Sequence, residues 1–248
     1  MKVGIVAALP AEVGALTPDP PAVGRLIPLG ENGLLALAGI GPERAERAAR
    51  RLLAAGASGL LSWGSAAGLA PALEPGALVL PEQVVAEGNG PLSVDPAWHG
   101  RLARALDGKA SPGPLAETRR MLRTPRAKQA LEAATGAVAA DMESAAVARI
   151  AAQAGVPFAA VRIVADDAGL GLPPAIAAAT TPDGDVSKAR LLLYTLGHPA
   201  SLAPLIRLGL RFRRAERTMA ATAGTLAARG WGLPESFREG PAGTRRPF

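Results

Sequence analysis

Glu143 and Asp166 are two carboxylates whose spacing along the chain suits chemistry at the edge of a sheet. Glu143 stands at the opening turn of a predicted helix, and Asp166 ends an apolar predicted strand. Helix starts and the carboxyl ends of strands meet at one rim of an open α/β sheet, where such folds bind their ligands. Two acids at that rim can hold a sugar hydroxyl and protonate a leaving base. The first hypothesis is therefore cleavage of a glycosyl bond.

Two further polar residues are predicted at the same rim. Glu12 follows the first apolar run, although a helix dipole alone would favour an acid there. Ser65 lies in a loop of small residues in which Ala66 and Ala67 allow a ligand to approach closely. Each acid taken singly is more simply explained as a helix cap. Four polar groups at several strand ends of one predicted sheet instead favour a binding site.

Other catalytic chemistries find little support in the sequence. The chain has no cysteine, and His99 and His198 lack the spacing of metal ligands, so no metal site is predicted. No Ser-His-Asp set can be assembled. Arg44 and Arg162 are the basic residues closest to the predicted rim. Each could meet an anion, but a solvated or salt-bridged arginine is the simpler expectation.

Alternating strands and helices predict one three-layer α/β domain, with helices on both faces of a mainly parallel sheet, over residues 1–200. Strands are expected at residues 3–8, 34–38, 59–62, 77–85, 138–140 and 158–164, and helices at 42–55, 125–134 and 143–154. Residues 63–71 are expected to form a loop, and residues 87–124 to be the least regular part of this domain. These elements would bring the polar residues above to one edge.

Composition excludes several classes of protein. Hydrophobic residues make up 49% of the 248 residues, enough for a core, whereas aromatic residues make up only 3%. Few aromatic side chains argue against platforms that stack nucleic-acid bases. No apolar run approaches the roughly 18 residues of a membrane span, and the first residues do not resemble a signal peptide. A cytoplasmic protein is expected.

Several motifs resemble those of the nucleoside phosphorylase and nucleosidase superfamily. They lie collinearly between residue 1 and about residue 168: the opening strand with Glu12, the glycine loop 39–45, the segment 62–71, and the pair Ala140–Ser144 and Val161–Asp166. The resemblance implies a nucleoside-phosphorylase-like sheet and an enzyme that cleaves a purine N-glycosidic bond. It also implies a homo-oligomer that needs no cofactor.

The resemblance implies a role for each site residue. Glu143 would accept hydrogen bonds from the ribose hydroxyls, with Met142 packed against the sugar. Asp166 would donate a proton at N7 as the purine leaves. Ser65 would face the ribose or the nucleophile, and Glu12 would orient or activate that nucleophile. The substrate-binding residues would also include Ala66, Ala67 and Arg162.

Phosphorolysis and hydrolysis both stay open at this stage. Phosphate is an alternative co-substrate to water, and Arg44 with Ser65 are the only candidates to bind it. Ala67 stands where many relatives have glycine, which narrows the loop near the sugar. Residues 112–124 also lack the Phe-Ile type of purine wall found in methylthioadenosine-type nucleosidases.

A closer resemblance is to the hopanoid-associated phosphorylases. It rests on the run Gly136–Ser144, on Leu172–Pro174 and Thr181–Gly184, and on the arginine-rich C-terminus. This family is implied to release adenine from adenosylhopane, a lipid-linked nucleoside. An aspartate at position 166 suits adenine better than asparagine would, by resemblance to adenine-cleaving relatives.

The C-terminal residues carry the net charge of the chain. Residues 201–248 contain nine arginines and three acids, and the formal net charge of the whole chain is +6. Residues 201–231 predict a basic amphipathic helical extension, and residues 232–248 a mobile tail. The simpler interpretation is a helix that covers the sheet. The alternative is a helix that docks on an anionic membrane surface, at its inner face. No motif supports nucleic-acid binding.

Three alternative functions stay open besides the lipid-linked substrate. One is a soluble nucleosidase for small adenine nucleosides of the methylthioadenosine or adenosylhomocysteine type. A second is a catalytically silent nucleoside-binding protein that acts as a sensor. The third is a peripheral module that binds membranes or nucleic acid, in which the acids merely cap helices.

Overall fold

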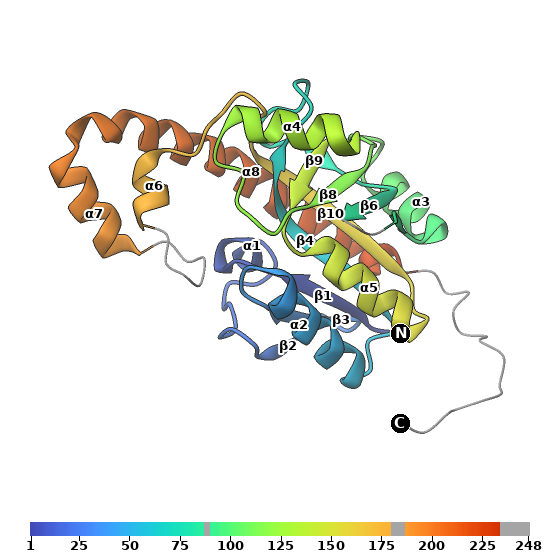
Figure 1. The fold of residues 1–248 in the computed structure, drawn as a ribbon. Helices are drawn as coiled ribbons and strands as arrows, with labels where there is room; N and C mark the ends of the chain where they lie inside the picture. Colours follow the sequence, from blue (N-terminus) through green and yellow to red (C-terminus); the bar gives the residue numbers. More distant parts are fainter. Residues whose placement is uncertain (87–89, 180–186, 234–248) are drawn as a thin grey trace.

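The computed structural model describes residues 1–86, 90–179 and 187–233, and in these residues a ten-stranded mixed sheet forms the core (Figure 1). The strands are β1 (Val3–Ala7), β2 (Leu26–Leu29), β3 (Gly33–Leu37), β4 (Gly59–Gly68), β5 (Leu78–Val79), β6 (Gln83–Ala86), β7 (Leu92–Ser93), β8 (Leu115–Glu117), β9 (Ala139–Asp141) and β10 (Phe158–Asp166). Their order is β2-β3-β1-β4-β9-β8-β6-β7, and β10 pairs with both β4 and β5.

Parallel pairing dominates the centre of the sheet, as the sequence predicts. β1 runs parallel to β3 and to the first half of β4, and β10 runs parallel to nearly the whole of β4. Antiparallel pairs are formed by β2, β5 and β7 with their neighbours, and by β9 with the end of β4. β1 and β3 are buried along their whole length, which explains their continuous apolar sequence. The expected α/β fold class is confirmed.

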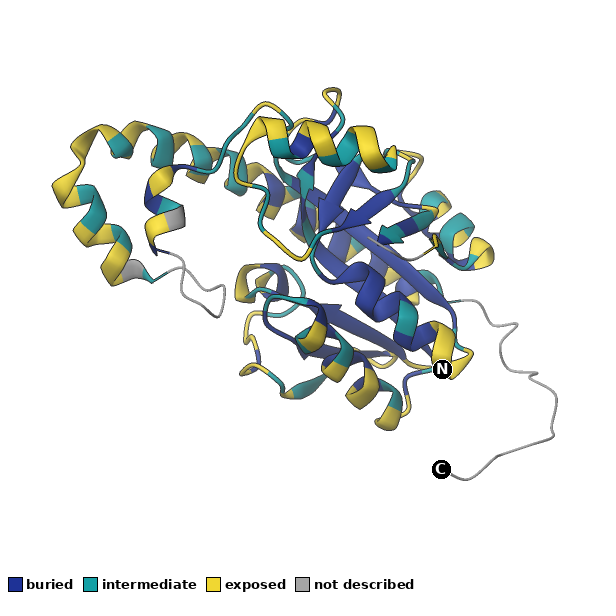
Figure 2. Cartoon of the chain, in the orientation of Figure 1, coloured by how far each residue is buried: buried dark blue, intermediate teal, exposed yellow. Residues whose placement is uncertain are grey.

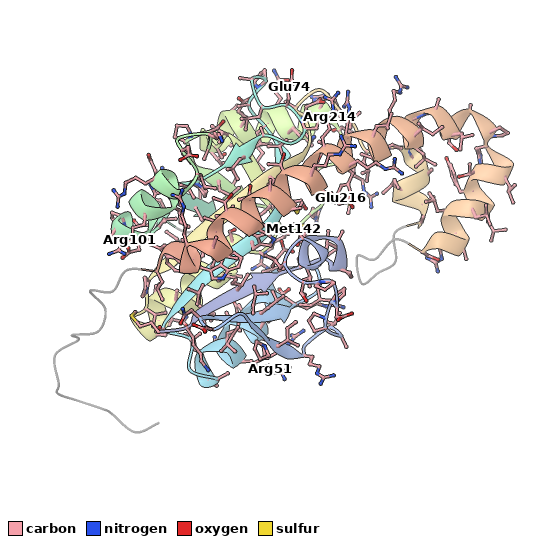
Figure 3. The ribbon with its side chains drawn as sticks, turned by 180° about the vertical axis from the view of Figure 1, so that it is seen from behind. Arg51, Glu74, Arg101, Met142, Arg214 and Glu216 are labelled. Atoms are coloured by element: carbon pink, nitrogen blue, oxygen red, sulfur yellow. The ribbon has the colours of Figure 1, made fainter. Side chains whose placement is uncertain are left out.

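Helices cover both faces of the sheet. The α-helices are α1 (Pro10–Gly14), α2 (Pro42–Ala54), α3 (Pro96–Ala105), α4 (Pro125–Thr135), α5 (Ser144–Ala154), α6 (Pro174–Ala179), α7 (Lys188–Gly197) and α8 (Leu202–Ala228). α2 and α5 pack side by side on one face, while α8 crosses the other face against β10 (Figures 1 and 3). Burial follows this arrangement, with the sheet buried between the two helical layers (Figure 2).

Three of the predicted boundaries are wrong. β4 continues to Gly68 through residues that the sequence predicts as a loop, because β10 and β9 pair with that stretch. The strand predicted over residues 77–85 is broken into β5 and β6 around Pro81, which has no amide hydrogen to donate. The part of residues 87–124 that is described contains β7, α3 and β8. Asp95 caps α3 by accepting a hydrogen bond from the Trp98 amide at 2.7 Å.

The long helix α8 belongs to two different parts of the molecule. Its second half packs on the sheet through buried residues that include Ala215, Met219 and Leu226. Its first half, with α6 and α7, stands away from the sheet as a helical arm (Figure 1). We call residues 187–214, which comprise α7 and the first half of α8, the arm. Residues 234–248, predicted as the greater part of a tail, lie outside the described residues.

Tryptophans anchor the far end of α8. Trp231 follows the helix and meets Trp63 of β4 edge to face, with ring centroids 6.4 Å apart. The Trp98 indole of α3 donates a hydrogen bond to the Trp231 carbonyl at 2.8 Å. Within residues 1–86, 90–179 and 187–233, every helix is too short or too polar to cross a membrane.

Candidate active site

Seven of the residues predicted for the site line one cavity of about 190 Å³. They are Glu12, Ser65, Ala66, Ala67, Met142, Glu143 and Asp166. The cavity lies where β1, β4, β9 and β10 end, which is the rim expected to bind ligands. The two carboxylates that are most distant in sequence from Glu12 therefore share its cavity.

Glu12 holds Ser65 in position. One carboxyl oxygen of Glu12 accepts hydrogen bonds from the Ser65 amide at 2.8 Å and from the Ser65 hydroxyl at 2.7 Å. The other oxygen accepts from the amides of Ala8 and Leu9, which precede α1. Gly64 permits this approach, because a Cβ atom there would lie 2.6 Å from the Glu12 carboxyl. Glu12 is thus both a helix-start acid and a residue of the site.

Glu143 is a buried carboxyl at the start of α5. It accepts a hydrogen bond from the Gly41 amide at 2.8 Å, which brings the glycine loop before α2 to the cavity. Burial, the first cause, together with the nearby charges of Asp141 and Glu12, raises the pKa of Glu143 to about 8, against the lowering effects of the Gly41 amide and Arg162. At neutral pH the empty site therefore holds a protonated Glu143.

A buried polar cluster supports the turn that carries Glu143. Asp141 accepts hydrogen bonds from the Ser144 amide at 3.1 Å and from the Ser144 hydroxyl at 2.6 Å, so it caps α5. The Arg162 guanidinium of β10 lies 2.5 Å from the Asp141 carboxylate. Arg162 also donates to the hydroxyl groups of Ser62 and Ser144. These contacts fix the backbone on both sides of Met142 and Glu143.

Asp166 ends β10 beside a β-bulge, where the pairing with β4 shifts between Val164 and Asp166. Lys128 of α4 donates a hydrogen bond to its carboxylate. Burial raises the pKa of Asp166 above its ordinary value, and so does the charge of Asp167, while Lys128 and Arg211 act in the opposite direction. Both sequence-based causes of a raised pKa, burial and Asp167, are present, but the lysine was not predicted.

The structure does not bring the two arginines into the lining of this cavity. Arg162 is only 2% exposed and lies behind Glu143, with its partners in the Asp141 cluster. Arg44 lines a separate cavity of about 140 Å³ beside α2, and its guanidinium lies against Gly39 of the glycine loop. The position of a phosphate therefore remains a prediction.

Sequence reasoning missed part of the cavity wall. Thr118, Met121 and Leu122 line the cavity opposite the strand ends and supply apolar surface, although that segment lacks the expected Phe-Ile pair. Their only signal was their place after a short strand, β8, which itself was not predicted. Among the described residues, no three His, Asp or Glu side chains gather in a way that can hold a metal ion.

Comparison with known proteins places this arrangement in a family. A family model described as the phosphorylase superfamily matches residues 2–181. Comparison with curated protein sequences finds no match. The structure is similar to futalosine hydrolase of Helicobacter pylori, with a TM-score of 0.67 and 17% identity over 94% of this chain and 98% of that one.

Two nucleosidases of known structure share the fold as well. One is the 5′-methylthioadenosine/S-adenosylhomocysteine nucleosidase of Helicobacter pylori, with a TM-score of 0.68 and 18% identity over 94% of this chain and 99% of that one. The other is the corresponding enzyme of Neisseria meningitidis, solved with methylthio-immucillin-A, with a TM-score of 0.67 and 18% identity over 93% and 98%. At such identities the likeness establishes the fold alone.

Proposed function

The chain belongs to the phosphorylase superfamily, and on that premise we propose that it cleaves the N-glycosidic bond of a purine nucleoside. The observation that carries the proposal is the shared cavity of Glu143 and Asp166, with Glu12 and Ser65 beside them. Four polar side chains from separate strand ends converge there, as a site for a sugar and a base requires. Similar folds that bind adenine nucleoside analogues support the same substrate class.

In the proposed reaction, the two acids stabilise opposite charges. Cleavage of the bond between C1′ and N9 builds positive charge on the ribose and leaves an electron pair on the base. Glu143 lies where a carboxylate can face the ribose, and Asp166, as the protonated acid, gives its proton to N7 of the purine. Ser65, oriented by Glu12, lies beside the ribose or the attacking nucleophile.

Binding of the ribose would change the ionisation of Glu143. Its pKa of about 8 keeps the carboxyl protonated in the empty cavity. Ribose hydroxyls donate hydrogen bonds to a carboxylate, and developing charge on C1′ favours that form further. We therefore expect Glu143 to lose its proton when substrate binds, which makes the acid responsive to the reaction rather than permanently charged.

We propose adenine release from adenosylhopane as the specific reaction. Aspartate at position 166 and the run Gly136–Ser144 support it by resemblance to the hopanoid-associated phosphorylases. Leu172–Pro174 of the same resemblance leads into α6, at the base of the helical arm, while Thr181–Gly184 lies outside the described residues. Hydrolysis and phosphorolysis are both retained, because Arg44 does not line the cavity.

We also propose that the arm docks on an anionic membrane surface, where a lipid-linked nucleoside would reside. Six of the eight large hydrophobic residues that are exposed among the described residues lie on the arm: Leu192, Leu193, Leu196, Leu202, Ile206 and Leu210. The arm contains no aspartate or glutamate and six lysines and arginines. Exposed leucines combined with positive charge match the interface of an anionic bilayer. The protein would then be cytoplasmic and peripheral.

A homo-oligomer is part of the same proposal. A cavity of about 190 Å³ is smaller than the roughly 300–1,000 Å³ of most ligand sites. A neighbouring copy that extends the apolar wall of Met121 and Leu122 would enlarge the contact with substrate. Sedimentation velocity of the full chain, with and without substrate, tests this part of the proposal independently.

Product analysis with two substrates in two buffers tests the function. The full chain is incubated with adenosylhopane or with methylthioadenosine, in phosphate buffer and in phosphate-free buffer, and adenine and the sugar product are measured. We expect adenine from adenosylhopane. Preferred cleavage of methylthioadenosine would instead establish the soluble nucleosidase, and nucleoside binding without adenine release would establish a sensor. A sugar 1-phosphate formed only with phosphate identifies phosphorolysis.

A further inference from the structure

Lys128 is a lysine in an unusual position. Its side chain is 0% exposed, although lysine is almost never fully buried unless it is paired. It is also the one buried residue of α4, a helix whose other side chains are exposed or half-buried. A helix that sends only a cation into the protein interior does not use that residue for apolar packing. The lysine must therefore be held by specific partners.

The partners of Lys128 are the two consecutive residues that end β10. Its ammonium group donates one hydrogen bond to Oδ2 of Asp166 and another to the backbone carbonyl of Asp167 at 2.6 Å. Asp166 lines the candidate active site, whereas Lys128 does not. The lysine thus approaches the acid from behind, and the second carboxyl oxygen, Oδ1, can carry the proton that faces the base.

We propose that Lys128 is a positioning residue for the reaction, which orients the Asp166 carboxyl and stabilises the carboxylate that remains once its proton has been donated. The inference rests on the proposed function. In the step, the bond between C1′ and N9 breaks with both electrons passing to the base, while the nucleophile oxygen bonds to C1′. The proton moves from Oδ1 of Asp166 to N7. Asp166 is left as a carboxylate beside the Lys128 ammonium group.

The charges that face Asp166 decide how strong an acid it is. Lys128 reaches it from α4, Asp167 from the next position of the chain, and Arg211 from α8 through an ion pair with Asp167 at 2.7 Å. Burial disfavours the carboxylate, so without the lysine the proton would be held more tightly. A weaker acid transfers its proton less readily to the leaving base.

The test compares the pH dependence of turnover in Lys128→Met and in the wild type. We expect the alkaline limb of kcat/KM, which reports loss of the Asp166 proton, to move to higher pH in the variant. We also expect kcat at its plateau to fall by roughly ten- to a hundred-fold, within the range typical of general-acid effects. Lys109→Met, in which an exposed lysine is removed, serves as the matched control and should change neither.

Two further measurements separate positioning from a structural role. If Lys128 acts through Asp166, the double variant Lys128→Met/Asp166→Asn turns over no more slowly than Asp166→Asn alone. Because this double variant removes both charges together, it also remains informative where Lys128→Met folds poorly. A carbon-13 NMR titration of Asp166 in the free protein should show a higher pKa in Lys128→Met, without reference to any activity.

Each outcome has a distinct meaning. An unmoved alkaline limb and an unmoved Asp166 titration would overturn the role of Lys128 while leaving the proposed function intact. A further loss of turnover in the double variant would likewise assign the lysine to structure alone. Absence of adenine release by the wild-type protein would overturn the proposed function, and the NMR titration would still decide whether the lysine controls the acid.

Discussion

Arg162 and Asp141 form a buried ion pair directly behind the turn that carries Glu143. The guanidinium and carboxylate groups lie 2.5 Å apart, and the arginine side chain is only 3% exposed. Asp141 in turn caps α5, while Arg162 binds the hydroxyl groups of two serines. The pair therefore links strand β10, which ends in Asp166, to the helix start that holds Glu143.

Loss of the arginine should destabilise the whole domain. In Arg162→Met, Asp141 becomes a buried charge without its cationic partner, and we expect the free energy of unfolding to fall by about 3–5 kcal/mol. Urea denaturation followed by circular dichroism measures the change. Arg50→Met is the control, because Arg50 is exposed and pairs with Glu46 at only 4.0 Å, so its removal should cost about 1 kcal/mol or less. Equal losses in the two variants would contradict this account.

Glu143 should make the stability of the protein fall with rising pH. Its pKa is about 8 in the folded protein but near 4.5 in the unfolded chain, so between these values the folded state binds more protons. The free energy of unfolding contributed by this group therefore decreases as pH rises from about 4.5 to about 8. Glu143→Gln cannot ionise and should lose that dependence. Urea titrations at both ends of the window, with the exposed Glu31→Gln as control, test the prediction.

The same acid should release a proton when a nucleoside binds. If ribose hydroxyls favour the carboxylate form of Glu143, affinity increases as pH rises toward about 8. Calorimetric titrations in two buffers that differ in ionisation enthalpy would reveal the released proton. Glu143→Gln should show no such release, and identical heats for the wild-type protein in both buffers would contradict the prediction.

Asp166→Asn should abolish turnover while leaving nucleoside binding within about ten-fold of the wild type. An amide of the same shape can still contact the base, but it cannot donate a proton to it, and general-acid contributions amount to about 10²–10⁴-fold in rate. Adenine release and equilibrium binding are measured on the same preparation. The matched control is Asp107→Asn at an exposed position, which should retain full activity. Undiminished turnover in Asp166→Asn would remove the acid from the mechanism.

The arm should bind anionic vesicles and lose that binding when its leucines are made polar. We expect co-sedimentation of the full chain with vesicles rich in phosphatidylglycerol, and weaker binding as salt is added. A triple variant of Leu192, Leu193 and Leu196 to serine removes exposed apolar surface without touching the sheet, so it should lower vesicle binding and leave the free energy of unfolding nearly unchanged. Replacing the buried Met219 by alanine should do the reverse. Absent or salt-independent sedimentation would refute membrane docking.

The sequence predicted those features that depend on local pattern. Buried parallel strands have continuous apolar sequences, so β1, β3 and β10 could be located, and with them the rim where Glu12, Glu143 and Asp166 meet. Helix starts such as Pro42 and ends such as Gly155 have local signals as well. The cavity could therefore be assembled from strand ends alone.

Features that depend on distant partners could not be predicted. Lys128 appears in sequence as an ordinary residue of a helix, and its burial follows only from where α4 packs relative to the end of β10. Arg162 was expected near a ligand, but Asp141 and two serines compete for its guanidinium inside the protein. Residues 63–68 contain the small residues of a loop, yet pairing from both sides makes them a strand.

α8 is a single continuous helix of 27 residues, so it is about 40 Å long at 1.5 Å per residue. Its first half carries the exposed leucines, its second half lies along β10, and Arg211, near the middle, grips the residue next to Asp166. Such a rod behaves as a lever: a load that tilts its free end also turns the end seated on the sheet. Where the molecule attaches and where it holds its acid are mechanically one piece.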